Sequence, residues 1–290
     1  MDNFLLSLFL TILILSLWIL PNVYAVAGTL LLTVYASYLN EISFSSVIII
    51  MILTFAGYHF IQRDGDKSTV LRIILLMLVF WALFSEDYEG RVLSWSGQLE
   101  LLKSQQRFII NLNFEKILAA ILLAAYQFNP KLSLKYWKEV FTSAWSILFL
   151  VYIVLLIPLI VMLYIFMDLN IDSLHLSTLV LNAFLIAFAE EVLFRGILQN
   201  WLIQVVRIKI GPSMGWLAIL IVSIVYGLFH VKFGIFIGLF SSFVGGAYGY
   251  IYRKSGKIEV AILMHFAISL TFCLVLAFYG LGDFLPVMIY

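Results

Sequence analysis

Long apolar stretches, broken by short polar segments, run along the whole chain. A membrane-spanning helix needs about 20 mostly apolar residues, and on that rule the pattern predicts ten helices. Their approximate ranges are 4–20, 22–39, 43–62, 69–85, 108–128, 142–167, 177–203, 214–231, 234–252 and 258–280. Charged and turn-forming residues gather between them, as in "QRDGDKS" after the third and "RKSGK" before the tenth. The predicted fold class is therefore all-α, a polytopic bundle of about ten transmembrane helices.

The first apolar stretch is expected to be a transmembrane helix rather than a cleaved signal peptide. A signal peptide begins with a positively charged segment, whereas the residues before this stretch include Asp2 and no Lys or Arg. The apolar pattern also continues past Ala27, the position of a small-residue cleavage site.

The composition supports a membrane protein and argues against other classes. Of the 290 residues, 64% are hydrophobic and 11% are charged, whereas soluble domains average roughly 45–50% and about 25%. The net charge of +1 gives no basic excess that would favour a nucleic acid partner, so none is expected. The single cysteine, Cys273, excludes an internal disulfide. Its apolar surroundings are typical of a packing residue.

The distribution of basic residues predicts the orientation of the chain, because Lys and Arg accumulate in cytoplasmic loops. If the N-terminus lies outside, eleven of the seventeen basic residues fall in cytoplasmic loops. They are Arg63, Lys67, Arg72, Lys131, Lys135, Lys138, Arg207, Lys209, Arg253, Lys254 and Lys257. We therefore expect a multi-pass protein with both termini outside. Its membrane is expected to be a prokaryotic plasma membrane. The outer loop 86–107 is amphipathic and is expected to lie along the membrane surface.

The polar residues within predicted helices gather after residue 180. We therefore predict two parts, a scaffold of transmembrane helices over 1–140 and a functional helix bundle over 141–290. The pair Glu115 and Lys116 lies in the first part and is interpreted as an interfacial couple, with a place in a substrate groove as the less favoured alternative.

The segment "AFAEEVLFRGIL" places Glu190, Glu191 and Arg195 within one predicted span. A charged side chain in a span costs about 2.5–3.5 kcal/mol on insertion scales, so such residues usually face the protein interior and mark a site. Glu191 and Arg195 are four apart and share a helix face, where they can pair. Glu190 is rotated about 100° away and is predicted to be a spare carboxylate. The alternative is an ion pair that only locks helix packing.

Two histidines strengthen the hypothesis of a site. His230 ends one predicted span in "YGLFH", and His265 lies early in another in "ILMHFAIS". A lone histidine in an apolar helix is more often a packing residue, but two of them on different helices favour a shared site. Straight, ideal helices would place Glu190 at mid-depth, His230 near the outer end and His265 about 10 Å above the cytoplasmic end. On that geometry the three residues would not meet.

Three motifs in this order resemble one family. "EEVLFR" fits Glu-Glu-x-x-x-Arg, "YGLFH" fits aromatic-x-x-x-His, and "HFAIS" partly fits His-x-x-x-Asn/Asp. Together they resemble the CAAX-processing and bacteriocin-processing (CPBP, Abi or Rce1-type) family of intramembrane proteases, over about residues 140–280. The resemblance implies an endopeptidase that hydrolyses a peptide or lipid-anchored, CAAX-like substrate without a cofactor.

The resemblance also implies roles for the matching positions. Glu190 and His230 would activate a water molecule, while His265 and Ser269 would stabilise the oxyanion. The supporting positions would be Glu191, Arg195 and Tyr226. The expected partners are the lipid bilayer and a peptide or protein substrate, with or without a lipid.

Position 269 departs from the family pattern, because it is Ser where Asn or Asp is usual. Loss of one oxyanion donor typically costs about 10²–10³ in rate. Ser269 therefore predicts a slow enzyme, a changed substrate or, as the alternative function, a non-catalytic CPBP-like protein that binds a peptide in an immunity or regulatory role. Tyr226, where the family has Phe, is expected to be a mild exchange. A transporter is a weaker alternative, because the repeated, broken half-helices of transporters are absent.

A zinc site is the alternative to metal-free hydrolysis. Glu190, His230 and His265 with a water molecule would suit zinc, although the His-Glu-x-x-His spacing of common zinc proteases is absent. In the helix over 234–252, glycines four apart predict a close-packed seam: Gly234, Gly238, Gly245 and Gly249. We expect this seam to bring the neighbouring helices, over 214–231 and 258–280, together around the site.

Overall fold

The described part of the chain is almost entirely helical. The computed structural model describes residues 3–38, 42–58, 93–95, 110–127, 133–145, 173–231 and 234–279. The elements are α1 (Asn3–Ile19), α2 (Asn22–Tyr38), α3 (Phe44–Gly57), β1 (Leu93–Trp95), β2 (Ile110–Leu112), α5 (Phe114–Gln127), α7 (Ser173–Glu191), η3 (Val192–Gln199), α8 (Asn200–Lys209), η4 (Pro212–Gly215), α9 (Trp216–His230), α10 (Ile235–Ser255) and α11 (Ile258–Tyr279). Residues 134–145 are also helical. The predicted all-α class is confirmed, with one short antiparallel pair of strands in which Leu93 faces Leu112.

Most predicted helices have counterparts, with two corrections. The helix predicted over 108–128 begins too early, because 110–112 is strand β2 and α5 starts at Phe114. Asn113 sets this start, since its side-chain oxygen accepts a hydrogen bond of 2.8 Å from the backbone N–H of Lys116, a typical N-cap. The helix predicted over 177–203 runs further in both directions, because α7, η3 and α8 follow one another directly from 173 to 209.

Several predictions fall outside the described residues. They include the whole helix 69–85, residues 146–167 of the sixth predicted helix and all of the loop 86–107 apart from β1. The orientation of the chain and the division at residue 140 stay predictions.

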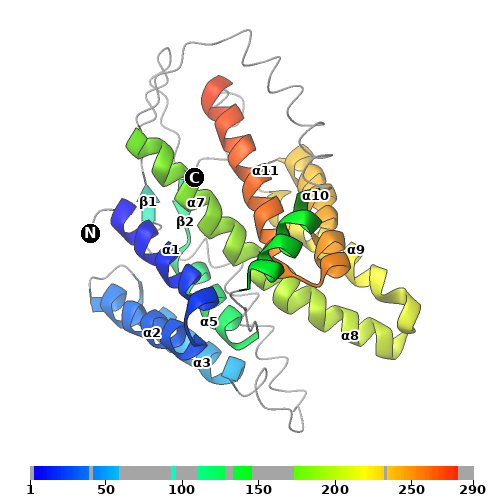
Figure 1. Cartoon of the computed structure of the whole chain (residues 1–290), viewed down its shortest axis with the longest axis horizontal. Coiled ribbons are helices and arrows are strands. Elements are labelled where there is room, and N and C mark those ends of the chain that lie inside the picture. Colours follow the sequence, from blue (N-terminus) through cyan, green and yellow to red (C-terminus); the bar gives the residue numbers. More distant parts are fainter. Residues whose placement is uncertain are drawn as a thin grey trace.

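Helix α5 is the central helix of the N-terminal half. All residues from Phe114 to Ala125 are buried, and α5 contacts α1, α2, α3, α7 and η3. In Figure 1 it lies near α1, α2, α3 and α7. A helix that is buried all round has no solvent-facing side, so the polar side chains in its first turn, Glu115 and Lys116, lie inside the protein. Their interpretation as an interfacial couple is therefore wrong.

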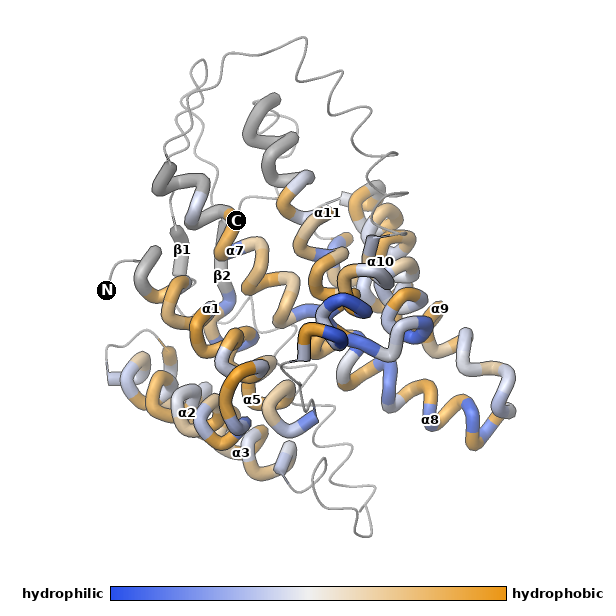
Figure 2. The backbone as a smooth tube through the Cα atoms, viewed as in Figure 1, coloured by the Kyte–Doolittle hydropathy of each residue, from blue (hydrophilic) through white to orange (hydrophobic). Residues whose placement is uncertain are grey.

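Hydrophobic residues predominate along most of the helices (Figure 2), and many large apolar side chains are exposed on their outer faces. Examples on four different helices are Leu31 at 72% exposure, Phe55, Leu228 and Phe243 at 80%. Among the described residues, Pro212–His230 is the one helical segment long and apolar enough to cross a membrane. Shorter apolar helices lie at Leu6–Ile19, Phe44–Gly57 and Ile258–Thr271.

The glycine seam of α10 faces α9 and η3, whereas the predicted partner α11 is not among the nearest neighbours of its glycines. Gly238 packs on Gly227 and Val231, and Gly245 and Gly249 each face both η3 and α9. Gly234 lies outside the seam, because it caps α10 with φ 121°, and a Cβ at this position would meet no other atom within 4 Å. Its place in the predicted seam is therefore wrong.

Replacing Gly227 with Ala is expected to destabilise the α9–α10 contact. The added Cβ would overlap the Ser242 hydroxyl and lie 2.5 Å from the carbonyl oxygen of Gly238. Overpacking of this kind typically costs about 1–3 kcal/mol, which thermal unfolding in detergent measures. Gly246→Ala is the matched control on α10, because its nearest neighbour is Ser223 Oγ at 3.2 Å. An equal melting temperature for both variants would contradict the predicted close packing.

Candidate active site

The candidate site is built around the junction of α7 and η3. Glu190 and Glu191 are the last residues of α7, and Arg195 lies within the π-helical segment η3. A π-helix has i→i+5 hydrogen bonds and is frequently found at functional sites. Figure 1 shows α7, η3 and α8 as one long helical path across the molecule, with η3 at its centre.

Glu191 and Arg195 form the predicted intrahelical pair. Arg195 Nη1 lies 3.2 Å from Glu191 Oε1, and both side chains are fully buried. Arg195 Nη2 also donates a 2.9 Å hydrogen bond to the carbonyl oxygen of Gly245. The guanidinium faces the rings of Tyr226 and Tyr248, at 4.7 and 5.3 Å from their centroids. The pair thus joins η3 to α9 and α10.

The prediction that Glu190 is a spare carboxylate is wrong. Lys116 Nζ lies 2.8 Å from Glu190 Oε1, and both side chains are 6% exposed. The Tyr226 hydroxyl donates a 2.9 Å hydrogen bond to the other oxygen, Oε2. The sequence pattern missed this pair because the two residues are 74 positions apart and meet only through the central placement of α5.

The Tyr226 hydroxyl makes contacts that a Phe side chain could not make. The hydroxyl holds Glu190, and the same oxygen lies 3.5 Å from His265 Nε2. The extra hydroxyl of this position therefore connects two of the predicted catalytic residues.

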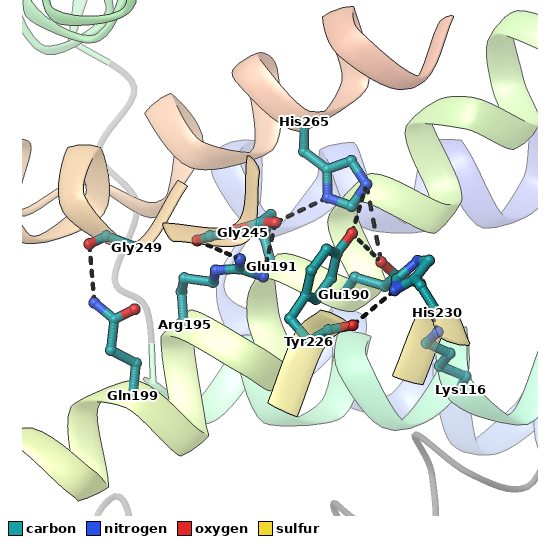
Figure 3. Close-up of polar contacts among 10 residues, drawn as sticks. All are labelled: Lys116, Glu190, Glu191, Arg195, Gln199, Tyr226, His230, Gly245, Gly249 and His265. Atoms are coloured by element: carbon teal, nitrogen blue, oxygen red, sulfur yellow. Dashed lines mark hydrogen bonds and ion pairs between the residues drawn. The ribbon is translucent and has the colours of Figure 1, made fainter. Parts of the chain in front are cut away.

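The two histidines lie in the same cluster (Figure 3). His265 Nδ1 is 2.8 Å from Glu191 Oε1, and its Nε2 is 3.8 Å from Glu190 Oε2. The His265 ring stacks on Tyr248 with centroids 4.9 Å apart. His230 Nδ1 is 2.8 Å from the carbonyl oxygen of Tyr226. Because a carbonyl only accepts, Nδ1 is the donor, and a neutral His230 ring carries no proton on Nε2.

Straight, parallel helices would keep Glu190, His230 and His265 at different depths, and the structure does not have that geometry. Helix α9 turns back from the end of α8 (Figure 1) and packs against η3. Its last turn carries Tyr226 and His230, and the Tyr226 hydroxyl meets Glu190. A C-terminal residue of one helix can therefore lie beside the middle of the α7–η3–α8 path.

Ser269 is the predicted site residue that the structure does not connect to the cluster. It lies one turn beyond His265 on α11 and is partly buried. Within the described ranges, it makes no hydrogen bond with the other site residues.

The described residues include no group of three His, Cys, Asp or Glu side chains placed to hold a metal ion. The carboxylate that zinc would need already contacts Lys116 through one oxygen and Tyr226 through the other.

Comparison with known proteins gives one match. The model of the Rce1-like family, described as type II CAAX prenyl endopeptidase Rce1-like, matches residues 172–271. The matched range contains the three motifs and all seven predicted site residues, but not Lys116. No curated protein and no solved structure matched the chain. The predicted resemblance is thus confirmed over residues 172–271, which are similar to the Rce1-like family of type II CAAX prenyl endopeptidases.

Proposed function

We propose that the chain is a multi-pass membrane endopeptidase that hydrolyses a peptide bond in a peptide or in a lipid-anchored, CAAX-like substrate. The observation that carries the proposal is the convergence of the three family motifs, from α7, η3, α9 and α11, on one buried polar cluster. Buried ionisable groups in an apolar bundle are costly, and their convergence on one point favours a catalytic role over separate packing roles.

In the proposed reaction, Glu190 and His230 together act as the general base. They take a proton from a water molecule, and the hydroxide attacks the carbonyl carbon of the scissile peptide. The carbon–nitrogen bond then breaks as the held proton passes to the leaving amine. Two features support this assignment: Glu190 is held by two donors, and the His230 tautomer leaves Nε2 able to accept a proton.

The proposed oxyanion donors are His265 and Ser269. Glu191 fixes the His265 ring through Nδ1, so a protonated ring would present Nε2–H to the developing negative charge. Ser269 has a shorter side chain than the Asn or Asp of the family, and we expect it to act weakly. No metal is required by this scheme.

A lipid environment is supported by the exposed apolar side chains on the outer faces of α1, α2, α3, α9 and α10. Apolar patches of this extent on a water-exposed surface would promote aggregation. The orientation with both termini outside rests on the distribution of basic residues alone, and the prokaryotic plasma membrane is an expectation beside it.

Changing Tyr226 to Phe, the family residue, is expected to lower the cleavage rate by roughly 10- to 100-fold. The loss corresponds to one hydrogen bond to a charged group, about 1.5–3 kcal/mol. The ring contacts with Arg195 and Phe194 remain, so the melting temperature should change little. Steady-state cleavage by the purified variant is the measurement. A rate that falls by less than about threefold would contradict the role given to the hydroxyl.

The proposal is tested by cleavage of defined peptides with purified protein in detergent. The panel contains the same peptides with and without a prenylated cysteine, and mass spectrometry locates the cut. Cleavage at one bond supports an endopeptidase, and the ratio of the two rates shows whether the lipid is recognised. A folded protein that binds peptides in the panel but cuts none would instead support the non-catalytic, peptide-binding function marked by Ser269.

A further inference from the structure

We propose that Lys116 of α5 is a positioning residue of the active site, which keeps Glu190 ionised and fixes the direction of its carboxylate. The inference rests on the proposed function, because Lys116 acts through the proposed general base. It adds a residue from outside the three motifs and outside the matched range 172–271. The N-terminal half of the chain would then complete the site rather than only support it.

The contact between the two side chains is direct and enclosed. Lys116 Nζ lies 2.8 Å from Glu190 Oε1 and 4.8 Å above the ring centroid of Phe229. Helix α5 is buried on all sides, and Asn113 caps its first turn through the backbone N–H of Lys116. The backbone that carries Lys116 is therefore held in place, and its side chain is buried in the protein beside the site residues (Figure 3).

The charges of the cluster explain why Glu190 needs a partner of its own. Glu191 already shares its charge with Arg195 and His265. The titratable and charged groups around Glu190 are Lys116 on α5, Tyr226 and His230 on α9, Tyr248 on α10, His265 on α11, and Glu191 and Arg195 on its own helical path. Lys116 carries the full positive charge that contacts Glu190 directly.

A buried carboxylate that loses its cation becomes costly and tends to take up a proton. A protonated Glu190 cannot accept a proton from water, so the base would be lost near neutral pH. Lys116 also engages Oε1, while Tyr226 and His265 lie beside Oε2. The lysine thereby sets which oxygen faces the histidine.

The first test is the pH dependence of peptide cleavage by the purified full chain. Removal of the cation disfavours the ionised form of Glu190, so the acid limb of the profile should move to higher pH in Lys116→Met. We expect a rate loss of about tenfold or more near pH 6.5 and recovery to within about threefold near pH 9. Lys116→Arg keeps the charge and should keep the wild-type profile.

Lys257→Met is the matched control. Lys257 forms an ion pair of similar length, 2.7 Å to Glu139, but the Glu139 side chain is 53% exposed. The hydrogen bond and positive charge of Lys257 lower the pKa of Glu139, and neither residue is part of the catalytic cluster. The control should keep both rate and pH profile. An unchanged or faster Lys116→Met, or a loss that is equal at every pH and not rescued by Arg, would overturn the inference and leave the proposed function standing.

The second test does not depend on activity and so separates the two proposals. If the wild type cleaves no peptide, the proposed function fails, and the pairing is still tested by thermal unfolding. Lys116→Met should lower the melting temperature, because it leaves the buried Glu190 carboxylate without its cation. Adding Glu190→Gln should restore most of the loss. A double variant that melts no higher than Lys116→Met would show that Lys116 does not serve Glu190 and would overturn the inference.

Discussion

Glu190→Gln is expected to abolish peptide cleavage, with a rate loss of at least about 10²–10⁴, the usual contribution of a general base. The amide has nearly the shape of the carboxylate and can still meet the Tyr226 hydroxyl, but it cannot take a proton from water. The rate of cleavage of a defined peptide by purified protein is the measurement.

Two further variants separate lost chemistry from lost folding. Glu190→Gln leaves the Lys116 ammonium buried without its carboxylate, which itself destabilises the protein. The double variant with Lys116→Met no longer contains this unpaired buried charge. It should remain inactive and melt close to the wild type. Glu139→Gln, at an exposed position, should keep full activity. Substantial cleavage by the double variant would remove Glu190 from the proposed mechanism.

Arg195→Met is expected to have the largest effect on stability. The substitution removes the cation from the fully buried Glu191 and leaves the carbonyl oxygen of Gly245 without its donor. Breaking a buried pair from one side costs about 3–5 kcal/mol, which corresponds to a loss of roughly 6 °C or more in melting temperature. Thermal unfolding in detergent measures it.

The controls for Arg195 test charge and shape separately. Arg253→Met makes the same change at an exposed position in the last turn of α10 and should melt like the wild type. Arg195→Lys keeps the charge but loses the planar guanidinium, which contacts both Glu191 and the carbonyl oxygen of Gly245. Its melting temperature should therefore lie between those of Arg195→Met and Arg253→Met. If Arg195→Met melted like the wild type, the pair would not be holding η3 to α10.

The local part of the site could be predicted from the sequence. The spacing of Glu191 and Arg195 fixes a shared helix face, and the structure contains their ion pair. The motif residues Tyr226 and His230 lie one helical turn apart, and His230 binds the Tyr226 carbonyl within that turn. These contacts depend on helix geometry over four residues, which a sequence specifies directly.

The contacts between distant segments could not be predicted in the same way. Straight, parallel helices would separate His230 from Glu190, whereas α9 turns back from α8 and packs its last turn against the α7–η3 junction. The buried position of Lys116 could not be predicted from its own segment, because burial of α5 on all sides is a property of its neighbours. One signal was present: Lys116 lies inside a predicted span, and an ionisable residue there suggests a functional site, as it does for Glu190.

The central claim is a metal-free hydrolysis that depends on Glu190, and cleavage in the presence of a strong chelator tests it most directly. Purified wild type is incubated with the chelator, passed over a desalting column and assayed beside Glu190→Gln on the same peptide. We predict that the wild type keeps its rate and that the variant shows none. A wild-type rate that falls after chelation and returns with added zinc, or equal cleavage by both proteins, would contradict the account.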